Sequence, residues 1–196
     1  MLCKVFPKSP RPVFKRDTNM RELLTRAKVA PERVINSRST HYDQRSGLTR
    51  CTKGTGRPPC TMCPFVTDLP NQTIKEIMIE SSGVSVPVQG RITCKSSGPG
   101  GFLYCLTNTK TKKQYIGESG RKKPVVRFRE HKYDIEYSKT NKCVARHFVT
   151  SNSTTSDLKF TPFMAVKNKN PYVRKFLERE FINNHNLVEV GINVNL

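Results

Sequence analysis

The sequence contains no tryptophan, few acidic residues and no long apolar run. Hydrophobic residues make up 35% of its 196 residues. We therefore expect one modest hydrophobic core and a smaller module that needs a bound metal or another cross-link to be stable. No apolar stretch approaches the roughly 18 residues that a membrane-spanning helix requires. No Lys-rich amphipathic helix has a broad apolar face. These absences argue against a membrane protein.

Acidic residues are scarce beside basic ones. The 15 Asp and Glu stand against 35 Lys and Arg, which gives a formal net charge of +20. Such an excess attracts polyanions and favours phosphate contacts. The basic residues are interleaved with the patterns of a folded domain, so nucleic acid is the leading partner. An anionic membrane surface and a merely solvated surface are the alternatives.

The beginning of the chain, Met1 to Pro7, lacks the apolar segment of a secretory signal. This predicts an intracellular, reducing compartment. Seven cysteines, an odd number, fit poorly with a closed disulfide framework. We therefore expect free thiols or metal thiolates.

Four of these cysteines are candidates for one structural zinc site. Cys51, Cys60 and Cys63 supply three thiols, two of them at C-x2-C spacing, and Cys94 follows an intervening hairpin pattern. Tetrahedral Zn²⁺ takes four such ligands. His41 is the alternative fourth ligand. Unligated thiols, or a disulfide in an oxidising compartment, are the alternatives to zinc.

Alternating and helical patterns predict a compact α+β domain with a small antiparallel sheet flanked by helices. The expected elements are hairpins at 73–88 and 102–117, a strand at 158–166, and helices from Pro124 to about Tyr137 and from Pro171 through Ile182. We divide the chain into a basic N-terminal segment with a short helix (1–46), a cysteine-rich zinc module with a hairpin (47–94) and the α+β domain (95–196).

One carboxylate is expected on an apolar helix face. Val173, Phe176 and Leu177 recur at helical spacing, and Glu180 follows three residues later. Burying an isolated carboxylate is costly unless a cation, hydrogen bonds or a metal compensates. A hard oxygen ligand suits Mg²⁺ or Mn²⁺. The alternative is a helix-edge Glu180 that reaches solvent or pairs with a neighbouring basic residue.

Ordered motifs in the second half resemble the GIY-YIG endonuclease superfamily. Phe102 to Tyr104 and Tyr115 to Gly117 resemble its defining pair, with the second motif intact and the first keeping its Tyr. Downstream, Arg127 to His131 resembles the helix with the catalytic Arg, Arg179 to Ile182 the segment with the metal-binding Glu, and Gly191 to Asn193 the terminal Asn. The resemblance implies the GIY-YIG nuclease fold and metal-dependent cleavage of DNA.

The resemblance also implies roles for individual residues. The implied catalytic set is Tyr104, Tyr115, Arg127, His131, Glu180 and Asn193. The tyrosines would position the attacking water and help to deprotonate it, Arg127 would stabilise the charged phosphorane, and Glu180 would hold one Mg²⁺ or Mn²⁺. The expected DNA-binding set is Arg121, Lys122, Lys123, Arg129, Lys132 and His147.

Two departures from the superfamily leave alternatives open. The spacing from Tyr115 to Arg127 is a residue or two longer than usual, and Pro124 intervenes, so Arg121 is an alternative to Arg127. The context of Phe128 and His131 favours Arg127. For His131 and His147, packing without a catalytic role is the alternative.

A narrower resemblance covers most of the chain. Gln114 to Arg121, Thr93 to Ser96 and Cys60 to Pro64 resemble the C-terminal endonuclease region of Penelope-like retroelements. In those elements this region follows a reverse transcriptase and is thought to nick target DNA to expose a primer. The resemblance implies element RNA and a reverse transcriptase as further partners, and a nuclear location. We expect a C-terminal fragment, a truncated copy or a freestanding derivative.

Two further classes of function compete with the nuclease. One is a catalytically inactive, zinc-containing nucleic-acid-binding module derived from such an element, which would bind DNA in a salt-sensitive way without cutting it. The other is a structural zinc adaptor for another protein. The presence of all the implied catalytic residues favours the enzyme.

Overall fold

The computed structural model describes residues 46–51, 60–66 and 72–193. The chain divides into two units, Met1–His41 and Tyr42–Leu196, and every described residue belongs to the second. The predicted N-terminal helix and the alternative zinc ligand His41 therefore lie outside the described residues. No helix in the described part is both long and apolar enough to cross a membrane.

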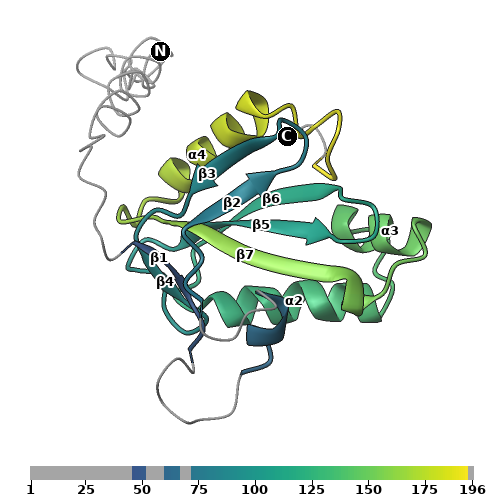
Figure 1. Cartoon of the computed structure of the whole chain (residues 1–196), viewed down its shortest axis with the longest axis horizontal. Coiled ribbons are helices and arrows are strands. Elements are labelled where there is room, and N and C mark those ends of the chain that lie inside the picture. The colour runs from purple at the N-terminus through teal and green to yellow at the C-terminus, as the bar shows by residue number, and fades with distance from the viewer. Residues whose placement is uncertain (1–45, 52–59, 67–71, 194–196) are drawn as a thin grey trace, which may run out of the picture. The chain divides into compact units, whose positions relative to one another are not determined.

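A three-stranded antiparallel sheet carries the centre of the fold (Figure 1). Its strands are β5 (Phe102–Asn108), β6 (Gln114–Ser119) and β7 (Leu158–Ala165), in the order β6-β5-β7. The central strand β5 is paired on both edges and is almost entirely buried. This sheet and its helices confirm the predicted α+β class.

Three helices accompany the sheet: α2 (Pro124–Glu136), α3 (Cys143–Thr150) and α4 (Pro171–Asn184). Figure 1 shows α2 and α4 on either side of the three strands. Both begin with a proline, whose fixed φ and missing N–H suit a first helical position. The Asn170 side chain caps α4 by accepting a hydrogen bond from the Tyr172 backbone N–H.

The helix α3 was not predicted. It has only eight residues, and its buried residues Val144, Ala145 and Phe148 make a pattern too short to stand out from a strand or a loop. It is stabilised mainly by tertiary contact with α2.

Two smaller strand pairs lie beside the central sheet. The predicted hairpin at 73–88 forms from β2 (Glu76–Ile79) and β3 (Val84–Pro87). The other pair, β1 (Gly47–Thr49) and β4 (Arg91–Thr93), is parallel. This pairing joins strands far apart in the sequence and was not predicted. Single-turn 3-10 helices, η1 (Cys63–Phe65) and η2 (Thr155–Asp157), complete the described elements.

One hydrophobic cluster joins the cysteine-rich segment to the sheet. Leu48, Met62 and Cys63 are buried in the same cluster as Phe128 of α2 and Phe160 of β7. Phe65 of η1 contacts Phe128 with ring centroids 4.8 Å apart. The described residues of segment 47–94 therefore share a core with the sheet. The domain boundary at residue 94 stays a prediction.

Candidate active site and metal centre

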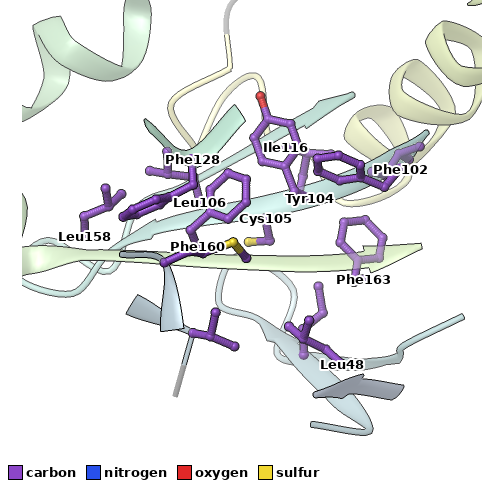
Figure 2. Close-up of a cluster of buried hydrophobic side chains, with 14 of the residues drawn as sticks. Leu48, Phe102, Tyr104, Cys105, Leu106, Ile116, Phe128, Leu158, Phe160 and Phe163 are labelled. Carbon is purple, nitrogen blue, oxygen red and sulfur yellow. The ribbon is translucent and has the colours of Figure 1, made fainter. Parts of the chain in front are cut away.

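Tyr104 lies at the centre of a polar cluster on the buried sheet. Its ring is fully buried and stacks on Phe160 with centroids 4.8 Å apart. Figure 2 shows this ring packed in the hydrophobic cluster, with its hydroxyl pointing away from the other side chains drawn. Burial of aromatic carbon beside a polar tip is a common way to hold a phenol rigidly.

The Tyr104 hydroxyl makes two hydrogen bonds to helix α2. It accepts one from Arg127 Nε at 3.0 Å and lies 2.8 Å from His131 Nε2. Because Arg127 can only donate, the Tyr104 proton is directed to His131 Nε2, which leaves the His131 proton on Nδ1. Burial and the Arg127 charge lower the pKa of His131 to about 3, so the ring is neutral at physiological pH.

Tyr115 lies beside Tyr104 on the neighbouring strand. The centroids of the two rings are 6.3 Å apart, and Tyr115 is 6.0 Å from the His131 ring. Burial raises the pKa of Tyr115 to about 12 and that of Tyr104 well above its usual range. Neither phenol is ionised at neutral pH, so each acts through its hydrogen bonds.

Gly117 makes room for the tyrosine pair. It pairs with Tyr104 in the β5–β6 register. A Cβ atom at Gly117 would overlap the Tyr104 hydroxyl oxygen and lie 2.7 Å from Cε1 of Tyr115. No other residue fits this position without moving the two rings.

Arg127 is the arginine that reaches Tyr104. Besides that bond, its NH1 donates to Glu130 Oε2 at 2.8 Å. Burial acts to lower the pKa of Arg127, but Tyr104 and Glu130 outweigh it and raise the pKa, so the guanidinium is always charged. Arg121 instead donates to the other oxygen of Glu130 and leaves 60% of its side chain exposed.

The acidic residue beside this cluster is Glu178. Its Oε1 accepts a hydrogen bond from the Glu118 backbone N–H at 3.1 Å. Burial, followed by repulsion from the Glu118 carboxylate, raises the pKa of Glu178 to about 7. The Glu178 charge helps to raise the pKa of Tyr104 and of Tyr115, and the Arg127 charge opposes the rise in the pKa of Glu178. This carboxyl group therefore lies within electrostatic reach of the other candidate residues.

No described hydrogen bond or ion pair joins Glu180 to this cluster. Residues two apart on a helix point about 200° from each other, so Glu180 and Glu178 lie on different sides of α4. On the predicted apolar face Phe176 is 40% exposed, whereas Ile182 is 2% exposed. Glu178 precedes Ile182 by four residues and shares its side of the helix. That four-residue spacing was the signal in the sequence.

An ion pair that was not predicted holds α4 against the strand ends. Arg174 Nε donates to Glu118 Oε2 at 2.7 Å, and its NH1 donates to the Gly100 carbonyl at 3.0 Å. Both charged side chains are largely buried, so loss of either one would leave the other as an unpaired buried charge. Arg174 lies one helical turn before Glu178, so this clamp fixes the segment that carries the carboxylate.

Asn193 joins the C-terminal segment to β6. Its Oδ1 accepts from the Ile116 N–H at 2.9 Å, and its Nδ2 donates to the Ile116 carbonyl at 2.8 Å. Ile116 stands between Tyr115 and Gly117 in the strand. The amide of Asn193 thus braces the backbone of the motif without reaching the cluster through a described contact.

The residues expected to bind DNA are spread over several surfaces. Arg121, Lys122 and Lys123 are exposed just before α2. Arg129 Nε donates to Thr61 Oγ1 at 3.2 Å, and Lys132 pairs with Glu136 at 3.2 Å.

His147 lies on α3, where its Nε2 is 2.9 Å from Thr111 Oγ1. Burial and the nearby charge of Lys113 lower its pKa. This histidine is tied to the β5–β6 turn and is not among the partners of Tyr104.

The four predicted cysteines come together in space. The Sγ atoms of Cys51, Cys60, Cys63 and Cys94 all lie within 4.8 Å of one another. Cys63 Sγ is 3.5 Å from Cys51, 3.6 Å from Cys60 and 3.3 Å from Cys94. These separations exceed the roughly 2.05 Å of a disulfide and approach the roughly 3.8 Å edge of a tetrahedral Zn–S₄ site. The four sulfurs could hold one metal ion, with Cys94 as fourth member.

Comparisons with known proteins give two structural neighbours. No protein-family model matches the sequence, and no curated protein sequence matches it. A solved structure of a point mutant of the catalytic domain of intron endonuclease I-TevI is 18% identical over 48% of this chain and 93% of that chain, with a TM-score of 0.41. A second structure, the catalytic domain of homing endonuclease I-TevI, is 19% identical over 49% of this chain and 99% of that chain, with a TM-score of 0.40.

Proposed function

We propose that this protein is a divalent-metal-dependent endonuclease that nicks DNA, with its active site at Tyr104, Tyr115, Arg127, His131 and Glu178. The proposal rests on one observation. A half-buried carboxylate, Glu178, lies near a cation held in place, Arg127, and near two tyrosine side chains. Glu178 has a pKa raised to about 7, and Arg127 donates to Tyr104. Perturbed acid and base groups that converge in this way are typical of functional sites.

Glu178 fits the role of ligand to Mg²⁺ or Mn²⁺. Among the described residues, its hydrogen bond comes from a backbone N–H and it forms no ion pair, so no cationic side chain contacts its oxygens directly. Hard divalent ions accept one carboxylate and complete their coordination with water and phosphate oxygens. When bound, such an ion supplies charge stabilisation and an activated water for phosphodiester hydrolysis.

The other residues divide the remaining tasks. Arg127 is permanently charged and stabilises the negative charge that develops on the phosphorane. Tyr115 is the less buried of the two tyrosines, and we assign it the orientation of the attacking water. The Tyr104–His131 pair holds Arg127 and Tyr115 in place, because Tyr104 bonds to Arg127 and packs beside Tyr115.

Nicking of supercoiled plasmid DNA tests this proposal. We expect the wild-type protein to produce open circles with Mg²⁺ or Mn²⁺ and none with a chelator. Arg127→Gln should lower the rate by about 10²–10³-fold, as loss of one transition-state donor does, while DNA binding persists. Salt-sensitive binding without nicking in the wild type would contradict the nuclease proposal and favour the inactive binding module.

We also propose that the four cysteines bind one structural Zn²⁺. Their sulfurs are close enough to surround one ion, and four thiolates make a closed site without a free position for substrate. The ion would fasten the segment after β1 to η1 and to the end of β4.

The resemblance to Penelope-like elements extends the proposal to priming. A nick that primes target-primed reverse transcription in the nucleus must leave a 3′-hydroxyl that a polymerase can extend. Extension of the nicked strand by a DNA polymerase, without prior end treatment, is the expected result. In that role, a reverse transcriptase and element RNA would be the partners. Ends that require phosphatase treatment before extension would argue against priming.

A further inference from the structure

A cavity lined by positive charge lies outside the Tyr104 cluster. Its volume is about 430 Å³, and the described residues that line it are Thr49, Arg50, Cys51, Arg91, Thr93 and Lys95. Three of these lining residues are cations, and none of the described lining residues is acidic. None of them belongs to the proposed active site.

The parallel β1–β4 pair explains why cations and cysteines meet here. Thr49 pairs with Thr93, so the two strands end at the same edge. The residues that follow, Arg50-Cys51 on one chain segment and Cys94-Lys95 on the other, leave the pair side by side. Each segment thus delivers one cysteine to the four-sulfur cluster and one cation to the cavity.

The lining matches the chemistry of a phosphodiester. Arginine presents a fork of donors to phosphate oxygens, lysine a point charge, and threonine a hydroxyl donor. Arg91 and Lys95 are exposed, and neither forms an ion pair with a described residue. Their charges are therefore available to a ligand.

We propose that this cavity binds the phosphodiester backbone of DNA at a second position, away from the bond that is cut. The choice of DNA as the polyanion rests on the proposed function. A polymer is favoured over a small anion because basic residues continue from the cysteine segment onto α2: Arg129 donates to Thr61, and Lys132 lies 5.9 Å from the centre of the Phe65 ring. DNA held at both places would be fixed in register before cleavage.

Fluorescence anisotropy with a short labelled duplex tests the second contact. The full chain is titrated without added divalent ions at several salt concentrations, so that cleavage plays no part. The double variant Arg91→Gln/Lys95→Gln removes two cavity charges. The matched control, Lys112→Gln/Lys159→Gln, removes two exposed charges near the other end of the sheet, where Lys159 pairs with Thr107.

Loss of two phosphate contacts should reduce the slope of log K against log salt by about 1.8. We expect that reduction for the cavity variant and less than half of it for the control. An equal reduction in the two variants, or no reduction in either, would overturn the proposal. If the double variant fails to fold by circular dichroism, the single variant Arg91→Gln should reduce the slope by about 0.9. A protein that binds through the cavity but never nicks would refute the nuclease proposal alone.

Discussion

The two candidate metal centres of this protein are built in opposite ways. The cysteine centre gathers four soft sulfur ligands from loops and strand ends and leaves no position for a substrate. The Glu178 centre offers one hard carboxylate beside a cation and two phenols, all on helices and strands. The first is suited to holding the chain together, and the second to sharing an ion with a substrate phosphate. The comparison teaches that ligand number and hardness separate a structural metal from a catalytic one.

Removal of a cysteine ligand should have the largest effect on stability. Cys63 is within 3.6 Å of the other three sulfurs, so Cys63→Ser should abolish zinc binding and cost several kcal/mol of folding free energy. Metal analysis and thermal unfolding check this. Cys143→Ser, a half-buried cysteine outside the cluster, is the control. Unchanged zinc content in Cys63→Ser would refute this ligand set. The cysteine centre could then no longer be contrasted with the Glu178 centre as a structural metal site.

Substitution of Gly117 should damage the Glu178 centre through its tyrosines. Gly117→Ala puts a methyl group where the Tyr104 hydroxyl lies, and overpacking of this kind costs about 1–3 kcal/mol. We expect both lower stability and slower nicking.

Gly83→Ala is the matched control for Gly117→Ala. Gly83 has φ +64 but nothing within 4 Å of an added Cβ, so it should lose stability of about 1 kcal/mol and keep full nicking activity. Equal nicking by the two variants would show that the tyrosine geometry does not matter.

A smaller effect on stability is expected from pH, and it should arise at the Glu178 centre. The pKa of Glu178 is raised from an ordinary value of 4.5 to about 7, so the folded protein holds this proton more tightly than the unfolded chain. Stability from the protonated form is fully present below pH 4.5 and is lost as the pH rises through about 7.

Glu178→Gln removes that loss. Without added divalent ions, the melting temperature of Glu178→Gln minus that of wild type should increase as the pH is raised from 4.5 to 8. Addition of Mg²⁺ at pH 8 should raise the melting temperature of wild type only. A constant difference between the two proteins across this range would contradict the raised pKa.

The sequence predicted the parts of the molecule that depend on local spacing. Both hairpins and the helices beginning at Pro124 and Pro171 form where alternation and helical periodicity put them. The cysteine set was also found, because a C-x2-C knuckle restricts two ligands to the same place.

Parts that depend on tertiary contacts were missed or misplaced. The β1–β4 pair joins strands of three residues each that are remote in sequence, so no local pattern marks them. The Arg174–Glu118 ion pair joins a helix to a strand end, which periodicity cannot reveal. Periodicity pointed to Glu180, whereas the proposed Glu178 depends on how α4 packs against β6 and Phe163, which hydrophobicity alone does not specify.

In the proposed nuclease site, Glu178 and not Glu180 is the essential carboxylate. The most direct measurement is the plasmid-nicking rate of Glu178→Gln beside Glu180→Gln, two isosteric changes on the same helix. We predict at least about a hundredfold loss of rate for Glu178→Gln and a rate within about twofold of wild type for Glu180→Gln, a change at the level of an ordinary surface substitution. Nicking that survives Glu178→Gln, or is lost only in Glu180→Gln, would contradict the account.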